Sequence, residues 1–466
     1  MGKSNFTWMQ GRLSAVALAA GLGILGASPA VAQSMSGDIY QRANLLGTMG
    51  GLRTALGNEG ITFGLTDSEN LLDNASGGIK NGATMQGVTM ATVDVDTQAM
   101  FGLAGGTFHI SALQLHGQPI SGPYLGSLQA ANGNEGEDGT RLWEMWYDQS
   151  LDYGRYDIKI GQQSIDNEFM DSTYSALFVN TMAGWPLVPS DDLYGGGPAY
   201  PLSSLGVRLQ FKPAANQAIL AGVFDDNPGG GAFSDDAQYQ DRNGAKFNLN
   251  TGALFIAEYQ YSINQPAMGQ MVSASDKSEG LPGTYKIGGW YDTGAFPDQR
   301  YGTDGLSLAN PDSNGTPIMH HGNFGLYVVA DQTIWQSPVS STNNLNVFAR
   351  VMGAPDTQNL IDFFVNGGII YAEPIPGRSN DQLGLDFGLG KVSSRASGLD
   401  QDSGVPRRTT EELFELTYAA QVVPWLVVQP DIQYIINPGA GVQDPNDPTH
   451  NIRNELVVGA RVVTTF

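Results

Sequence analysis

Apolar side chains alternate with polar or small ones along most of this sequence, from about residue 60 to the C-terminus. In 205–211, for example, Leu, Val, Leu and Phe alternate with Gly, Arg and Gln. Because successive side chains of a strand point to opposite faces, this period of two predicts strands with one apolar face. Sixteen segments are predicted as strands: 60–67, 86–98, 105–115, 141–150, 154–163, 203–212, 217–224, 245–262, 283–292, 323–335, 344–352, 362–372, 381–391, 410–423, 425–436 and 453–466.

The connections between these segments alternate between long and short. The longest, 164–202, follows the fifth segment, whereas 213–216 is a tight turn. This alternation is typical of a transmembrane antiparallel β-barrel, which has long loops on one rim and short turns on the other. The connection 263–282 is an exception, because it is long where a short turn is expected. A soluble β-sandwich would not need this asymmetry, and a propeller would show repeats of ~40–45 residues, which we do not find.

Residues 1–32 have the composition of an export signal. A basic start, an apolar segment and the triplet Ala30-Val31-Ala32 predict a signal peptide that is cleaved near Ala32. An N-terminal membrane anchor is the alternative, but the apolar segment is short for a membrane span. No charge-free apolar stretch of ~18 residues follows, so we predict no transmembrane helix in the exported chain.

Composition excludes several functions. The chain has no cysteine, which rules out disulfides, thiolate-bound zinc, iron–sulfur clusters and thiol catalysis. Its formal net charge of −23 argues against a nucleic-acid partner, which would need a basic face. The sequence has neither a G-x-S-x-G motif nor a phosphate-binding loop, so we expect no enzyme and no cofactor. Clustered carboxylates in 225–241 could hold Ca²⁺, but their spacing matches no EF-hand, and we expect a solvated acidic loop without a metal.

Three groups of residues carry a family resemblance. The first is 44–56 followed by 60–63, and the third is 288–294. The second group consists of 159–163, Ile165-Asp166, Phe169, 178–180, 184–186 and Tyr200-Pro201. Together with a terminal strand that ends in Phe466, these residues resemble the carbohydrate-selective porin family of the OprB type. The sequence has Thr48 and Met49 where members of that family usually have Asp and Trp.

The resemblance implies a sixteen-stranded outer-membrane barrel at 59–466, preceded by a short periplasmic helical segment at 33–58. It implies passive diffusion of glucose-like mono- and small oligosaccharides into the periplasm. It also implies that the loop 164–202 folds into the lumen and narrows the channel. Two alternatives stay open: a general diffusion porin without sugar preference, and an exported soluble polysaccharide-binding β-protein.

Strand parity selects a candidate substrate path. A neutral sugar offers hydroxyl groups and an apolar ring face, so we expect planar aromatic and hydrogen-bonding side chains along its route. If Met145 and Tyr147 face lipid, their neighbours face the lumen, and the same reasoning applies to the other strands. The candidates are Trp146 and Trp290 for stacking, Arg208, Arg350, Lys159 and Glu144 as polar contacts, Asp148 and Asp292 beside them, and Trp185 in the long loop. The alternative for the strand tryptophans is a place in the aromatic girdle at the membrane interface.

The expected partners follow from this location. They are sugars as transported solutes, outer-membrane lipid and lipopolysaccharide, and the barrel-assembly machinery through the strand ending in Phe466. A homotrimer is left open by the sequence.

Overall fold

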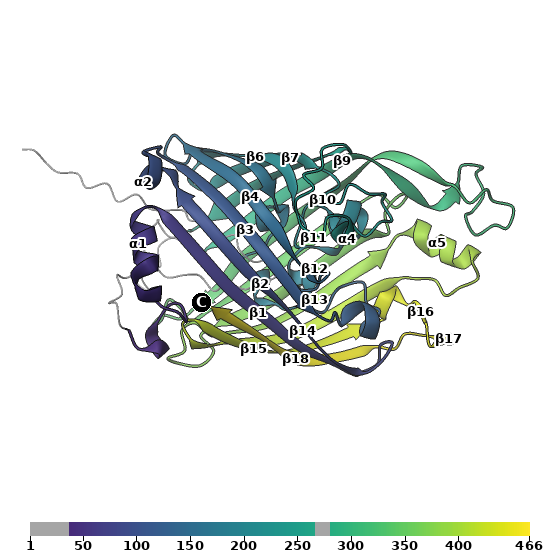
Figure 1. Ribbon diagram of the computed structural model, residues 1–466. Coiled ribbons are helices and arrows are strands. Elements are labelled where there is room, and N and C mark those ends of the chain that lie inside the picture. The colour runs from purple at the N-terminus through teal and green to yellow at the C-terminus, as the bar shows by residue number, and fades with distance from the viewer. Residues whose placement is uncertain (1–36, 266–279) are drawn as a thin grey trace, which may run out of the picture.

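The computed structural model describes residues 37–265 and 280–466. Sixteen antiparallel strands form one closed barrel (Figure 1), which confirms the predicted fold class and strand number. The barrel strands are β1 (Ile61–Ser76), β2 (Gly82–Asp96), β3 (Gly106–Gly117), β4 (Gly139–Leu151), β5 (Tyr156–Gln163), β6 (Ser204–Ala214), β7 (Gln217–Asp225), β8 (Ala253–Ile263), β9 (Gly283–Gly302), β10 (Pro317–Gln336), β11 (Asn344–Gly353), β12 (Ile361–Ala372), β13 (Gln382–Val392), β14 (Thr410–Val423), β15 (Leu426–Ile436) and β18 (Glu455–Thr465).

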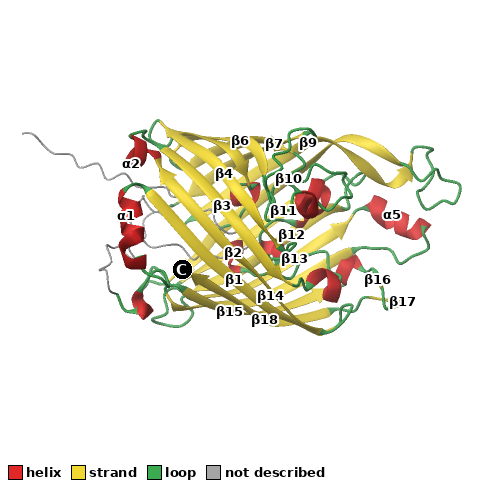
Figure 2. Ribbon diagram, viewed as in Figure 1, coloured by secondary structure: helices red, strands yellow, loops and turns green. Residues whose placement is uncertain are grey.

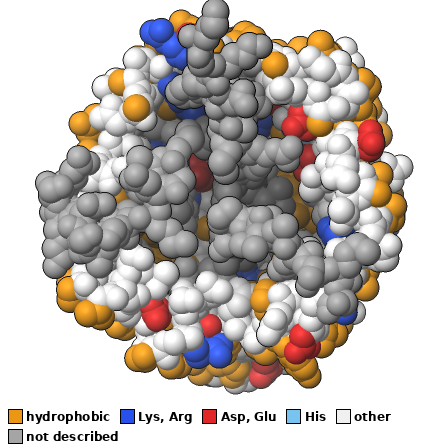
Figure 3. Space-filling model, turned by 90° about the vertical axis from the view of Figure 1, so that its left-hand side faces the viewer, with side chains coloured by type: hydrophobic (Ala, Val, Ile, Leu, Met, Phe, Trp, Pro, Cys, Tyr) orange, Lys and Arg blue, Asp and Glu red, His pale blue; other side chains and the backbone are white. Residues whose placement is uncertain are grey.

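The ring closes between the first and last strands. Each strand pairs with its neighbour in sequence, and β18 pairs with both β15 and β1. The register of this seam runs from Thr66 opposite Thr465 to Ser76 opposite Leu456. Closure leaves no unpaired edge in the barrel sheet of the described residues, which a lipid environment requires because it cannot hydrogen-bond to the backbone. Viewed from the end that carries the N-terminal helix, hydrophobic side chains gather around the circumference (Figure 3).

The helices are short. They are α1 (Leu52–Asn58), α2 (Thr97–Phe101), α3 (Leu187–Asp192), α4 (Ala237–Gln240) and α5 (Ser394–Asp402). Helices α1 and α2 lie at one rim and α5 at the other (Figure 2), whereas α3 belongs to the connection 164–202. The helix α1 lies at the same rim as the C-terminus (Figure 1), where Arg53 donates to the backbone oxygens of Phe63 and Phe466. Among the described residues, no helix has the length and apolarity needed to cross a membrane. The assignment of the α1 rim to the periplasm stays a prediction.

Several strand boundaries differ from the prediction. Strand β1 extends to Ser76, beyond the predicted end at 67, and β8 begins at Ala253 rather than at 245. Strands β9 and β10 continue past the predicted 283–292 and 323–335 into a hairpin that projects beyond the barrel (Figure 1). Polar residues interrupt the apolar face in these extensions, so the period of two alone does not reveal them.

Most connections on the rim opposite α1 are long, as predicted, but 77–81 and 354–360 are short. The connection between β15 and β18 contains a small hairpin, β16 (Gln443–Asp444) with β17 (Asp447–Asn451), which the sequence did not indicate. The predicted signal peptide and most of the unusual connection 263–282 lie outside the described residues.

Candidate functional site

The predicted parity holds on β9. Lys286, Trp290 and Asp292 are buried on the inner face, whereas Ile287 and Tyr291 are 59% and 49% exposed on the outer face. Inward polar side chains and outward apolar ones are the arrangement of a barrel with an aqueous interior.

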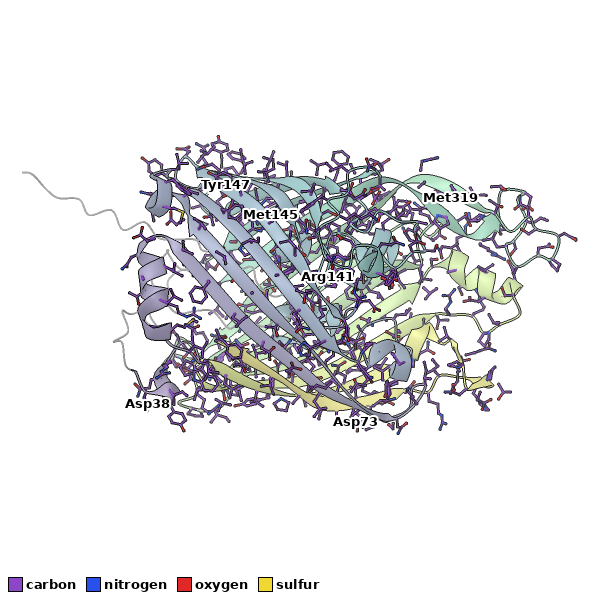
Figure 4. The ribbon with its side chains drawn as sticks, in the orientation of Figure 1. Asp38, Asp73, Arg141, Met145, Tyr147 and Met319 are labelled. Atoms are coloured by element: carbon purple, nitrogen blue, oxygen red, sulfur yellow. The ribbon has the colours of Figure 1, made fainter. Side chains whose placement is uncertain are left out.

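Strand β4 keeps the predicted parity over only part of its length. Met145 lies opposite Ile110 and Leu142 opposite Ala112, so Ser111 of β3 faces two residues of β4. This β-bulge turns both Trp143 and Glu144 inward. Met145 and Tyr147 follow Arg141 along the strand, towards the α1 rim (Figure 4). The inward position of Trp143 is not predictable from the period of two, because the bulge shifts the register within the strand.

The connection 164–202, which we call the long loop, crosses to inner-wall strands far from its own ends. Arg350 of β11 is fully buried and binds it at three points. The guanidinium donates to the backbone oxygens of Met170 at 3.2 Å and Gly184 at 2.8 Å, and also to that of Met182. Its Nε donates to Asn366 at 3.0 Å. With all these partners, Arg350 is placed as an anchor of the loop and not as an open contact.

Inward carboxylates receive the backbone amides of the long loop. Glu415 of β14 accepts from Val179 N at 2.6 Å and from Asn180 N at 3.0 Å. Glu258 of β8 accepts from Met170 N at 3.0 Å. Because loop amides buried away from water need acceptors, these carboxylates stabilise an irregular backbone inside the barrel. Sequence parity could have marked them as inward, but not as loop contacts.

A second connection, 118–138, also packs inside, which the sequence did not predict. We call it the second loop. Glu411 of β14 accepts from Leu128 N at 2.8 Å and Gln129 N at 2.9 Å. The two loops pair through Gly133 N to Val179 O at 2.9 Å. Two loops that hydrogen-bond to each other therefore lie inside the barrel, and β14 supplies a carboxylate to each of them.

A cluster of charges lies where the long loop leaves β5. Asp148, Lys159 and Arg208 are neighbours in register across β4, β5 and β6. Two cations side by side would repel, and Glu168 of the long loop pairs with both Lys159 and Arg208. Asp157 pairs with Arg208 from the same strand as Lys159. We call these five residues the charge cluster, and three of them were candidates from sequence.

The three candidate tryptophans are buried. Trp146 is 8% exposed, stacks on His109 with ring centroids 4.6 Å apart, and has Lys159 Nζ 4.4 Å from its ring centre. Trp290 is 4% exposed and packs in the apolar cluster beneath the long loop. Trp185 donates from Nε1 to Gly196 O at 2.8 Å within that loop.

The two other carboxylates accept backbone amides. Glu144 accepts from Ser164 N at 3.0 Å, at the start of the long loop. Asp292 accepts from Gly294 N at 2.7 Å on its own strand. Neither carboxylate lies among the five residues of the charge cluster.

Comparison with known proteins adds the decisive observation. The family described as "Carbohydrate-selective porin, OprB family" matches residues 80–466.

The chain belongs to this family.

Relatives agree with the porin assignment. Porin B of Pseudomonas aeruginosa is 25% identical over 456 residues, which cover 91% of each chain. A putative porin, QuiX, of Acinetobacter baylyi is 23% identical over 465 residues, covering 91% of this chain and 96% of that protein. Among solved structures, the high-pH form of Pseudomonas putida OprB superposes with a TM-score of 0.79 at 22% identity, covering 93% of this chain and 100% of that one. The low-pH form gives a TM-score of 0.55 at 17% identity, covering 92% and 99%.

The carbohydrate-selective porin is therefore a bacterial outer-membrane protein, and its family and fold are those of a channel rather than an enzyme. The acidic residues of 225–241 serve local turns in this porin. Asp225 accepts from Asn227 N, Asp236 from Gln238 N, and Asp241 from Ala245 N. In the described part of the chain, no group of three or more acidic or histidine side chains has metal-binding geometry.

The buried carboxylates of the two loops predict that docking of these loops inside the barrel depends on pH. Burial raises the pKa of Glu135 in the second loop, and of Asp166 and Asp191 in the long loop, to about 7. Burial also opposes ionisation of Glu168, but Lys159 and Arg208 outweigh it and lower its pKa to about 2. A carboxyl group whose pKa is raised by burial stabilises the docked loop at pH values below its unfolded pKa, which is 4.5 for Glu and 3.8 for Asp. This stabilisation is lost as the pH rises through 7. Glu168 acts oppositely, but its contribution is lost only as pH falls through 2.

We therefore expect both loops to be held more tightly at about pH 5 than at about pH 8. Hydrogen–deuterium exchange of the loop amides, corrected for intrinsic rates, should be slower at the lower pH by roughly tenfold or more. The strand amides of β12 serve as the internal control. Equal or stronger loop protection at the higher pH would contradict this prediction.

Proposed function

We propose that this porin lets glucose-like mono- and small oligosaccharides diffuse passively into the periplasm, with the long loop as the constriction. The observation that carries this proposal is the long loop fastened across the inside of a closed barrel by Arg350 and Glu415. A sixteen-stranded barrel is wide enough for an aqueous channel, so selectivity depends on what fills it. A fastened loop gives a fixed aperture rather than a fluctuating one.

The charge cluster is the proposed polar wall of the sugar path. Its ion pairs leave carboxylate and ammonium groups that can exchange hydrogen bonds with sugar hydroxyls. The side chains of Asp157 and Glu168 are 15% and 14% exposed, more than those of Lys159 and Arg208. Because its three carboxylates and two cations leave only a small net charge, a neutral solute is not excluded, and weak multiple contacts allow it to leave. Trp146 is proposed to stiffen this wall through Lys159, with Trp290 and Trp185 supporting the loop.

Liposome swelling tests the sugar preference. We expect glucose to enter faster than a neutral solute of the same size that lacks a hydroxyl-rich ring. Trp146→Ala should reduce this preference, because Lys159 loses the ring beneath it. Trp290→Ala is the matched control, because it removes a buried indole away from the charge cluster. It should widen the aperture for both solutes without reducing the preference for glucose. Equal rates for both solutes through the wild type would favour the general diffusion porin instead.

The exported location supports further proposals on processing and partners. Cleavage near Ala32 would leave a mature chain that inserts among outer-membrane lipid and lipopolysaccharide. Recognition by the barrel-assembly machinery is proposed through β18 and the terminal Phe466. Mass spectrometry of the purified mature protein checks the cleavage site.

A further inference from the structure

We infer that Asp226 and Asp292 bind a calcium ion, which ties the connection between β7 and β8 to the inner wall at β9. Asp226 directly follows β7 at the rim opposite α1, and Asp292 lies on the inner face of β9. In register, Leu254 of β8 pairs with both Phe224 of β7 and Asp292, so the two aspartates lie within about two residues of one level along the barrel. This inference does not depend on the sugar preference.

Each of the two carboxylates is held through one oxygen and leaves the other without a donor. Asp226 Oδ1 accepts from Gly252 N at 2.8 Å, and Asp292 Oδ1 accepts from Gly294 N at 2.7 Å. The Oδ2 atoms of both aspartates are shielded and accept no hydrogen bond from the described residues. Asp226 is 1% and Asp292 0% exposed, so bulk water does not solvate these oxygens. Buried acceptors without a donor are uncommon in native proteins and indicate a missing partner.

Oxygen atoms from three side chains converge where two glycines leave the backbone bare. A Cβ atom on Gly294 would lie 2.9 Å from Asp226 Oδ2 and 3.0 Å from Asp292 Oδ1. A Cβ atom on Gly252 would lie 2.2 Å from the same Asp226 oxygen and 2.8 Å from Thr293 Oγ1. Two carboxylates and a hydroxyl group therefore meet at one place, and all three are oxygen ligands.

The charges around this place are negative. Asp225 adds a third carboxylate, which accepts from Asn227 N at 3.0 Å and from Asn248 at 3.2 Å. In the described part of the chain, no cation is among the groups that act most strongly on Asp292 or Asp225, whereas Asp226 acts on both. Buried like charges are costly unless an opposite charge compensates them. One proton shared by Asp226 and Asp292 would leave two of the three charges, whereas a divalent cation leaves one.

The ligand set favours calcium among the divalent cations. Ca²⁺ takes carboxylate, hydroxyl and water oxygens in a flexible arrangement, whereas Mg²⁺ demands a near-ideal octahedron. Among the described residues, no three acidic or histidine side chains surround a metal position, so waters complete the coordination of this two-carboxylate site. We expect a dissociation constant of ~10⁻⁴–10⁻³ M, as in extracellular calcium modules. The spacing within 225–241 does not reveal the site, because the second carboxylate comes from β9.

A tyrosine of the long loop lies against this site. Tyr194 Cε2 is 2.8 Å from the position of the same Cβ atom on Gly294, and Tyr194 donates from its hydroxyl to Ala295 O at 2.6 Å. A bound ion therefore holds the connection between β7 and β8 beside the long loop. The phenol ring also provides a spectroscopic reporter, because an excited tyrosine transfers energy to a nearby Tb³⁺ ion, which occupies Ca²⁺ sites.

Tyrosine-sensitised Tb³⁺ luminescence of the purified porin tests the inference. Asp226→Asn keeps the acceptor for Gly252 N and places an amide donor near the free oxygen of Asp292, so this variant should fold without an ion. Asp236→Asn is the matched control, because it removes the same charge from the same connection, where Asp236 caps α4. The wild type and Asp236→Asn should each bind one Tb³⁺ that millimolar Ca²⁺ displaces. Asp226→Asn should weaken binding about tenfold or more, since even outer partners of metal ligands have effects of this size.

Thermal unfolding in detergent provides a second readout that needs no lanthanide. Millimolar Ca²⁺ should raise the unfolding midpoint of the wild type and of Asp236→Asn, because an ion that binds only the folded chain stabilises it. The midpoint of Asp226→Asn should not respond to Ca²⁺. Tyr194→Phe should dim the Tb³⁺ signal but keep the Ca²⁺ response. Equal Tb³⁺ affinity in Asp226→Asn and the wild type would overturn the inference. A wild type that responds to neither ion would overturn it as well, and would indicate that Asp226 and Asp292 share a proton instead.

Discussion

Replacing Arg350 with methionine is expected to raise the single-channel conductance severalfold and to abolish discrimination between sugars. Methionine keeps most of the volume but none of the donors that hold Met170, Met182 and Gly184. Each hydrogen bond from a charged donor contributes about 1.5–3 kcal/mol, so the loop loses several kcal/mol of docking free energy. Planar-bilayer conductance and liposome swelling with mono- and disaccharides measure the outcome.

The control for this variant is Arg378→Met. Arg378 pairs with Asp381 in the connection between β12 and β13, away from the long loop. The Arg378→Met variant removes the same charge without changing the constriction, and its conductance should match that of the wild type. If Arg350→Met folds into a heat-modifiable barrel with unchanged conductance and sugar rates, Arg350 does not fasten the aperture.

The second large effect is expected from Glu168→Gln. Glutamine is nearly isosteric but leaves Lys159 and Arg208 with fewer negative partners. Removing one partner of a buried ion pair typically costs about 3–5 kcal/mol. The channel should shift towards anions, because the local balance becomes more positive, and sugar flux should fall as the wall rearranges.

The reversal potential in a salt gradient measures this shift directly. Glu137→Gln is the matched control. Glu137 is exposed on the second loop, so this variant removes the same charge from the surface. An unchanged reversal potential for Glu168→Gln, or an equal shift for Glu137→Gln, would count against the charge cluster as the selective wall.

Sequence periodicity predicted the barrel because lipid requires an apolar side chain at every second position of each strand. The same requirement explains where the prediction ended too early. Strand β1 was cut short at 67, because Asp67 and Glu69 break the apolar face that identifies a membrane strand. Thr89 donates to Asp67 and His116 pairs with Glu69, so both carboxylates have polar partners on neighbouring strands.

The interior was harder to predict. Parity placed Lys159 and Arg208 inward, but contacts such as Arg350 with Gly184 join residues 166 positions apart. No local pattern encodes such contacts. Resemblance to a family indicated that the long loop enters the lumen, yet nothing in the sequence indicated that the second loop does so as well. Glu411 and Glu415 show why: a carboxylate that accepts loop amides looks in sequence like any inward acid.

The seam between β1 and β18 has a consequence for biogenesis. Its ladder joins Thr66 to Thr465, so the cylinder cannot shut until the ribosome has made nearly the whole polypeptide. The long loop, meanwhile, binds Gln429 and Arg461 through Leu177 O, and both partners are synthesised late. The long loop can therefore complete its contacts only once β15 and β18 have joined the sheet, which couples docking of the loop to closure of the ring.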